Sequence, residues 1–274
     1  MRVVNGLRKG LVTSLALNAA LVATQSKAEE HTSSEASIWG DSTDVTLGMA
    51  ASYAPRYPGS KNFNTTLQPS LHIERGIFFA DSEEGLGLQW QSNSGFSGSA
   101  SLGYDYGRAD GDSDYRYGSD KLKGMGEVGG ATVLNLNASQ EILPWLSINA
   151  KAELRTGGEK RGNRYRLGLE TTLYNSDHDT VSWNVDAHAG DGKFNQIYFG
   201  VTPEQSASSR YSAFKADSGI FAYSTELSWQ HTFDDHWSTV AGVELMHFTD
   251  QVRNSPLITK DSSPTSYVGV NYKF

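Results

Sequence analysis

The fold class of this chain is decided by a ten-residue stretch near its middle, Leu146-Ser147-Ile148-Asn149-Ala150-Lys151-Ala152-Glu153-Leu154-Arg155. Apolar and polar residues alternate along it, which is the period of a β-strand with two different faces. One face carries leucine, isoleucine and alanine, and the other carries serine, asparagine and three charged side chains. Such a strand separates an apolar medium from a polar one.

The same alternation recurs along most of the chain, and no stretch has the 3.6-residue period of a helix. Most of the predicted strands are about 9 to 13 residues long, enough to cross a bilayer at a tilt, whereas the strands of soluble sandwiches are usually nearer 5 or 6. The predicted strands span 44–53, 65–73, 76–81, 84–91, 96–106, 127–140, 146–155, 164–174, 181–190, 220–232, 237–248 and 265–274. We therefore predict an all-β, transmembrane antiparallel β-barrel of 12 strands over residues 44–274, an even number as expected for a bacterial outer-membrane barrel.

The connections between these strands favour the membrane barrel over a sandwich. Tight turns alternate with long loops, and outer-membrane barrels have short periplasmic turns and long outer loops. The tight turns are flanked by aromatic residues, as in an interfacial girdle, namely Trp90, Phe96, Trp145, Trp183, Phe233 and Trp237. The count depends on residues 67–79, which could form one long strand. We split them near 74–76, because eleven strands would put the longest loops on the wrong side.

The two ends of the chain indicate export and insertion into the outer membrane of a Gram-negative bacterium. Residues 1–28 have a positive start, a short apolar run and small residues before a cleavage point, which predicts a signal peptide. Residues 29–43 are polar and without period, so we expect a flexible periplasmic leader. The last strand ends in Tyr272 and Phe274. This aromatic ending resembles the signal that the barrel assembly machinery reads, so we expect that machinery and outer-membrane lipid as partners.

Composition and motifs exclude several classes of function. The chain has 274 residues, no cysteine and a net charge of −8, so we expect no thiolate chemistry and no nucleic-acid partner. It lacks a Gly-x-Ser-x-Gly elbow and a His-Glu-x-x-His helix. His231, Asp234, Asp235 and His236 cluster at a turn, and an acidic loop spans 107–126. We interpret both as solvated surface and predict no catalytic residue, no metal site and no cofactor.

Charged residues gather on the predicted inner face of the central strands. Both signs are interleaved, which favours a cross-strand ladder of ion pairs that fills a narrow lumen over a pore selective for one sign. The candidate lumen lining comprises Lys151, Glu153, Arg155, Arg164, Arg166, Glu170, Asp186 and His188.

The longest connection, 191–219, is a second candidate site. Its middle holds an apolar run that would be an aggregation liability in water, so we expect it to fold inward and cap the lumen. The candidate cap residues are Gln196, Tyr198, Phe199, Gly200, Pro203 and Gln205. A simple extension of the flanking strands is the alternative.

Several segments of the chain resemble the MipA/OmpV family of outer-membrane proteins, also called the MltA-interacting protein family. They follow the family's order along nearly the whole predicted mature chain, and the most specific is 196–207. The others are 55–60, 67–69, 75–79, 85–87, 122–126, 235–238, 254–257 and 272–274. The resemblance implies a twelve-stranded barrel with a partly occupied lumen. It also implies, from the family's named member, a scaffold that joins a lytic transglycosylase to a murein synthase.

Three hypotheses about function follow. The first is a non-enzymatic barrel that serves as a scaffold linking murein-cleaving and murein-synthesising enzymes. The second is a narrow small-solute channel, or a porin-like protein of osmotic or antibiotic response. The third, an outer-membrane hydrolase, is the weakest because no catalytic constellation supports it.

Overall fold

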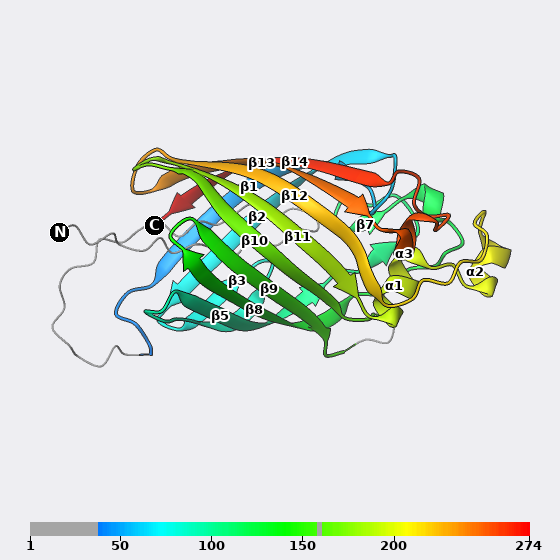
Figure 1. The fold of residues 1–274 in the computed structure, drawn as a ribbon, viewed down its shortest axis with the longest axis horizontal. Coiled ribbons are helices and arrows are strands. Elements are labelled where there is room, and N and C mark those ends of the chain that lie inside the picture. Colours follow the sequence, from blue (N-terminus) through cyan, green and yellow to red (C-terminus); the bar gives the residue numbers. More distant parts are fainter. Residues whose placement is uncertain (1–37, 158–160) are drawn as a thin grey trace.

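The computed structural model describes residues 38–157 and 161–274, and it is a closed antiparallel barrel of twelve strands (Figure 1). The predicted fold class is therefore confirmed. The barrel strands are β1 Asp44–Pro55, β2 Phe63–Arg75, β3 Phe78–Asp81, β4 Gly85–Gln91, β5 Phe96–Asp105, β8 Ala131–Leu143, β9 Leu146–Arg155, β10 Arg164–Asn175, β11 Asp179–Gly190, β12 Gly219–Thr232, β13 Trp237–Phe248 and β14 Ser262–Lys273. Pairing of β1 with β14, from Thr46↔Lys273 to Tyr53↔Ser266, closes the ring.

The barrel has two unlike ends. We call the end with the tight turns and Phe274 the turn end, and the opposite end, where the long connections lie, the loop end (Figure 1). The connections at the loop end contain three short helices, a 3₁₀ turn and a two-stranded sheet. These are α1 Gly192–Phe199, α2 Pro203–Ser208, α3 Asp250–Arg253, η1 Asp120–Leu122, and β6 Arg108–Ala109 with β7 Tyr117–Gly118. No helix among the described residues has the length and apolar composition to cross a bilayer.

Alternation decides which side chains face outward. Leu167 and Leu169 of β10 are exposed on the outside, whereas Glu153 of β9 and Asp186 of β11 are buried inside. The turn-end tryptophans Trp90, Trp145, Trp183 and Trp237 are all exposed, as a lipid-facing girdle requires.

One register irregularity reverses an expectation. Alternation places Phe221 on the same outward face as Tyr223, but pairing shifts from His188↔Ala222 to Ala189↔Ile220, so that Phe221 is an extra residue. This bulge turns the Phe221 ring inward, where only 1% of the residue is exposed. Alternation alone therefore misplaces Phe221, because a bulge interrupts the two-residue period.

The split of residues 67–79 into two strands is confirmed at Gly76. This glycine has a φ of 58°, and a Cβ there would overlap the carbonyl oxygen of Ile38. Residues 38–43 lie against the β2–β3 turn: Ile77 N donates to Ile38 O at 3.0 Å, and the rings of Trp39 and Phe78 stack at 4.8 Å. The predicted signal peptide, 1–28, and the first part of the predicted leader, 29–37, lie outside the described residues.

Candidate functional site in the barrel lumen

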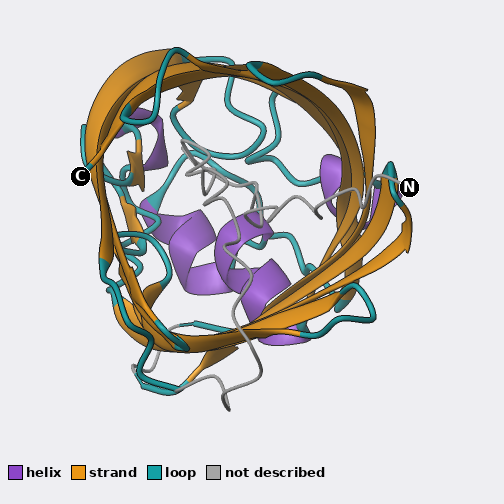
Figure 2. Cartoon of the chain, turned by 90° about the vertical axis from the view of Figure 1, so that its left-hand side faces the viewer, coloured by secondary structure: helices purple, strands orange, loops and turns teal. Residues whose placement is uncertain are grey.

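Two hydrophobic clusters lie at the loop end of the barrel, where α1 and α3 sit at the rim of the strands and α2 lies beyond it (Figure 1); viewed along the barrel axis, the helices project within the ring of strands (Figure 2). The first cluster joins α1 and α3 to inward-facing residues of β12 and β13. Its members are Phe194, Phe199, Ala216, Phe221, Ala222, Met246, Phe248 and Val252. The second joins four loops through Tyr57, Leu122, Met125, Val201, Tyr211 and Leu257. We call these two clusters together the plug.

Local hydrogen bonds fold the 191–219 connection into the plug. Asp191 caps α1, its Oδ1 accepting from Phe194 N at 2.7 Å. Gln196 Oε1 then accepts from Ala216 N at 2.9 Å, and the main chains of Val201 and Phe214 bond in both directions at 2.8 and 2.9 Å. The connection is thereby drawn into a compact hairpin whose apolar side chains face the barrel.

The candidate cap residues take different positions in this hairpin. Phe199 is 1% exposed within the first cluster, and Gly200 packs against Gln196 so closely that a Cβ would overlap its amide. Gln205 Nε2 donates to Met125 O at 2.7 Å, which ties α2 to the 106–130 loop. Pro203 begins α2 at an exposed position. A gating or ligand-binding role for these residues stays a prediction.

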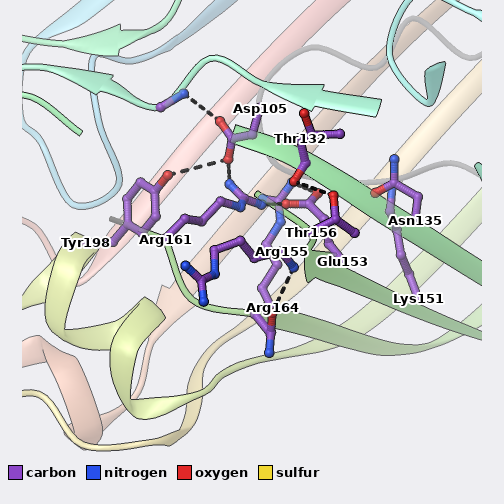
Figure 3. Close-up of polar contacts among 12 residues, drawn as sticks. Asp105, Thr132, Asn135, Lys151, Glu153, Arg155, Thr156, Arg161, Arg164 and Tyr198 are labelled. Atoms are coloured by element: carbon purple, nitrogen blue, oxygen red, sulfur yellow. Dashed lines mark hydrogen bonds and ion pairs between the residues drawn. The ribbon is translucent and has the colours of Figure 1, made fainter. Parts of the chain in front are cut away.

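Next to the plug, ion pairs join the loop-end termini of β5, β9 and β10 (Figure 3). The guanidinium of Arg161, which is 1% exposed, contacts both Asp105 and Glu153. Arg164 also reaches Glu153, with Nη2 and Oε2 at 2.6 Å. Tyr198 of α1 donates to Asp105 Oδ2 at 3.5 Å, so the network joins the plug to the wall. We call Asp105, Glu153, Arg161, Arg164 and Tyr198 the wall network.

The remaining candidate lining residues lie on the inward-facing side of their strands. Lys151 Nζ pairs with Glu84 Oε1 at 2.5 Å, and Arg166 Nε lies 3.7 Å from Asp186 Oδ1. Glu170 and His188 are buried, and His188 Nε2 shares a hydrogen bond of 2.9 Å with Ser224 Oγ. Arg155 is exposed at the loop end of β9, where its main-chain N donates to Asn163 Oδ1 at 2.9 Å.

Sequence reasoning missed the partners that come from loops and turns. No alternation extends to the loop and turn residues, so the two-residue period of the strands could not predict the positions of Arg161, Glu84 and Arg108. Arg108 is 2% exposed and its Nη1 donates to Tyr198 O at 3.5 Å. Burial lowers the pKa of Arg108, and burial raises the pKa of Tyr57 beyond its usual range, with a smaller contribution from Tyr211.

Within the described residues, no group of three His, Asp or Glu side chains could hold a metal ion.

The comparisons with known proteins agree with the predicted family. The family model described as "MltA-interacting protein MipA" matches residues 47–274. The MltA-interacting proteins of Escherichia coli strain K12 and Shigella flexneri are each 28% identical over 94 residues, which is 34% of this chain and 35% of theirs. The matched region thus spans about a third of the length of these relatives.

Two solved barrels also resemble the structure. The NanC porin has a TM-score of 0.46 at 10% identity and covers 83% of this chain and 100% of its own. The KdgM porin has a TM-score of 0.42 at 9% identity, with 84% of this chain and 99% of its own covered.

Proposed function

This chain belongs to the MipA family, and from that premise we propose that it is a non-enzymatic outer-membrane scaffold. In this proposal the barrel binds a lytic transglycosylase at its turn end, which faces the periplasm, and brings it together with a murein synthase. The relatives' name, MltA-interacting protein, supports the first of these partners. The murein synthase follows from the family resemblance alone.

The observation that carries the proposal is the plug at the loop end. Two hydrophobic clusters lie at the loop end, where a solute entering an open pore would pass, and the wall network links them to the barrel wall through Tyr198 and Asp105. Packed apolar side chains exclude water, so a barrel filled in this way is better suited to presenting a surface than to conducting solutes.

The turn end offers an acidic surface on two neighbouring turns, 176–178 and 233–236. The two turns are linked, since Thr232 N donates to His178 O at 2.8 Å. Asp234 accepts hydrogen bonds from the main chains of Trp237 and His236, which lower its pKa and keep it ionised. Asp177 and Asp235 are exposed beside it. A periplasmic enzyme with a basic patch would be complementary to these turns.

The test measures the affinity of the purified full-length protein for a lytic transglycosylase in detergent. We expect the double variant Asp177→Asn with Asp235→Asn to weaken binding by about tenfold, or about 1.4 kcal/mol. The matched control, Asp114→Asn with Asp261→Asn, removes two exposed acids from the loop end and should leave the affinity unchanged. The proposal fails if the unaltered protein does not bind, or if both double variants lose the same affinity.

A narrow solute channel is the second candidate, because the wall of the lumen below the plug is polar and charged. Asn135, Asn137 and Asn184 lie buried on that wall together with Glu170 and Glu226. A channel would require the plug to move, and this requirement separates the two candidates by experiment.

A further inference from the structure

The outer wall of the barrel carries a groove that crosses seven neighbouring strands, from β10 through β11, β12, β13, β14 and β1 to β2. Its volume is about 700 Å³. The residues that line it include Trp183, Leu227, Val243, Ser266, Tyr53 and Phe63. The first five of these are cross-strand partners in turn, so the groove follows one row of strand pairs around the barrel. We call it the outer groove.

A small side chain on β14 explains the depression in the wall. Ser266 pairs with Val243 on one side and with Tyr53 on the other, and both of these larger neighbours are exposed. The ring of Tyr53 stacks on that of Phe63 at 4.9 Å, which raises the rim near the loop end. Trp183 Nε1 donates to Thr225 Oγ1 at 2.8 Å, so the indole N–H is satisfied within the wall. The surface of the groove is therefore concave and mainly apolar.

The dimensions of the outer groove suit a single acyl chain. Six strand spacings of about 4.8 Å give it a length of about 30 Å. An acyl chain extends through one leaflet, about half of a hydrocarbon core that is ~30 Å thick. The row of pairs runs from Leu173, near the turn end of β10, to Phe63 at the loop end of β2. A second barrel would not fill the groove, because the convex wall of a barrel would contact only its rims.

Two lysines lie at the loop end of the outer groove. Lys61 and Lys260 are exposed on the β1–β2 and β13–β14 connections. The two connections are joined, since Lys61 N donates to Thr259 Oγ1 at 3.0 Å and Lys260 N donates to Gly59 O at 3.1 Å. Neither lysine takes part in an ion pair within residues 38–157 and 161–274. We call Lys61 and Lys260 the lysine pair.

Strand parity places the lysine pair on the side of the groove. The β1–β2 ladder continues to Asn62, whose O accepts from Arg56 N at 2.9 Å, so Lys61 has the outward parity of Phe63. The β13–β14 ladder continues to Asp261, whose O accepts from Phe248 N at 2.8 Å. Lys260 thus has the outward parity of Pro264, which lines the groove. Asp261 is an exposed carboxylate next to Lys260, but it has the inward parity of the buried Ser263.

The two ends of the outer groove differ in charge. At the turn end, Leu173 lies close to the 176–178 turn, which carries the exposed Asp177. At the loop end the lysine pair supplies two positive charges. An anionic head group is therefore favoured at the loop end and opposed at the turn end. Because the long loops of outer-membrane barrels face the outside of the cell, the favoured end lies at the outer leaflet.

We propose that the outer groove and the lysine pair together bind a phosphorylated, acylated glycolipid of the outer leaflet, of the lipid A class. One acyl chain lies along the groove over Ser266. A phosphate on the sugar head contacts Lys61 and Lys260. This site is independent of the scaffold function, since it lies on the lipid-facing wall and needs no partner protein.

The test is native mass spectrometry of the full-length protein in detergent, titrated with bisphosphorylated lipid A. We expect one lipid bound per barrel and no competition from phosphatidylethanolamine. Lys61→Gln with Lys260→Gln should weaken binding about tenfold, because each lysine near an anionic lipid head group contributes a modest attraction. The matched control, Lys121→Gln with Lys193→Gln, removes two exposed loop-end lysines that do not line the groove. It should leave the affinity unchanged.

A second pair of variants tests the groove by shape. Ser266→Phe fills the depression and should weaken binding at least tenfold. Ala150→Phe adds the same ring to an exposed outward position of β9, outside the groove, and should not. Heat-modifiable mobility verifies that each variant is folded. Equal affinity for lipid A without phosphates, equal losses in the two lysine double variants, equal affinities of the two phenylalanine variants, or a protein dimer in place of the lipid-bound barrel would overturn the proposal.

Discussion

At the scale of single residues, Arg161 is a loop side chain that forms ion pairs with two strands of the lumen wall. Its guanidinium reaches Asp105 on β5 and Glu153 on β9, so one loop side chain links two parts of the wall. Alternation predicted that Glu153 would face inward. It could not predict that Arg161 would pair with Glu153, because loop residues follow no alternation. Phe221 was misplaced for the related reason that a bulge resets the period within a strand.

Replacing Arg161 with methionine should destabilise the barrel by about 2–3 kcal/mol, because it leaves the buried Glu153 with Arg164 as its remaining cation and takes the cation from the half-buried Asp105. The control Lys215→Met removes a cation from an exposed pair, with 83% and 65% of the two side chains exposed. It should cost at most about 1 kcal/mol. Urea unfolding followed by tryptophan fluorescence measures both. Equal unfolding midpoints would show that the wall network does not stabilise the fold.

At the scale of elements, the strands were predictable and the helices were not. The twelve strands follow from alternation, and Gly76 marks the division between β2 and β3. The helices α1, α2 and α3 have 8, 6 and 4 residues, too few turns for a helical period to be recognised. The available signal was local: Thr202, Pro203 and Gln205 form a capping box with proline in the first turn of α2.

Loss of that cap should loosen α2 without unfolding the barrel. Thr202→Val removes the hydroxyl that accepts from Gln205 N at 3.2 Å, at a cost of about 1 kcal/mol. We expect faster proteolytic cleavage within 200–212 and unchanged heat-modifiable mobility. The control is Ala207→Ser at an exposed position of the same helix. Cleavage at the same rate in both variants would contradict a stabilising role for the cap.

The last strand should also direct assembly, as its aromatic ending predicts. Phe274 N donates to Val45 O at 2.9 Å, and its ring meets that of Tyr272 at 4.8 Å. Deleting Phe274 should slow insertion and increase degradation in the periplasm, measured by pulse-chase. Phe233→Ala, an exposed aromatic at another turn-end position, serves as the control. If insertion is as fast without Phe274 as with it, the assembly signal lies elsewhere.

At the scale of the whole molecule, the barrel has a charged lumen whose loop end is filled by its own connections. The inward charges could be predicted from the strands, and the inward folding of 191–219 from its apolar run. The packing of four loops into one cluster could not be predicted from the sequence. Its members Tyr57, Leu122, Val201 and Leu257 are far apart in the chain, and no local pattern relates them. The plug favours the proposed scaffold over a conducting channel.

Single-channel recording in planar bilayers tests that claim most directly. We predict that the full-length protein shows no steady conductance, since the plug and the wall network occupy the path along the axis. A folded variant that lacks residues 196–207 should conduct, because it loses Phe199 and Val201 from the plug. Steady conductance of the full-length protein, at the level of the deletion variant, would contradict the account.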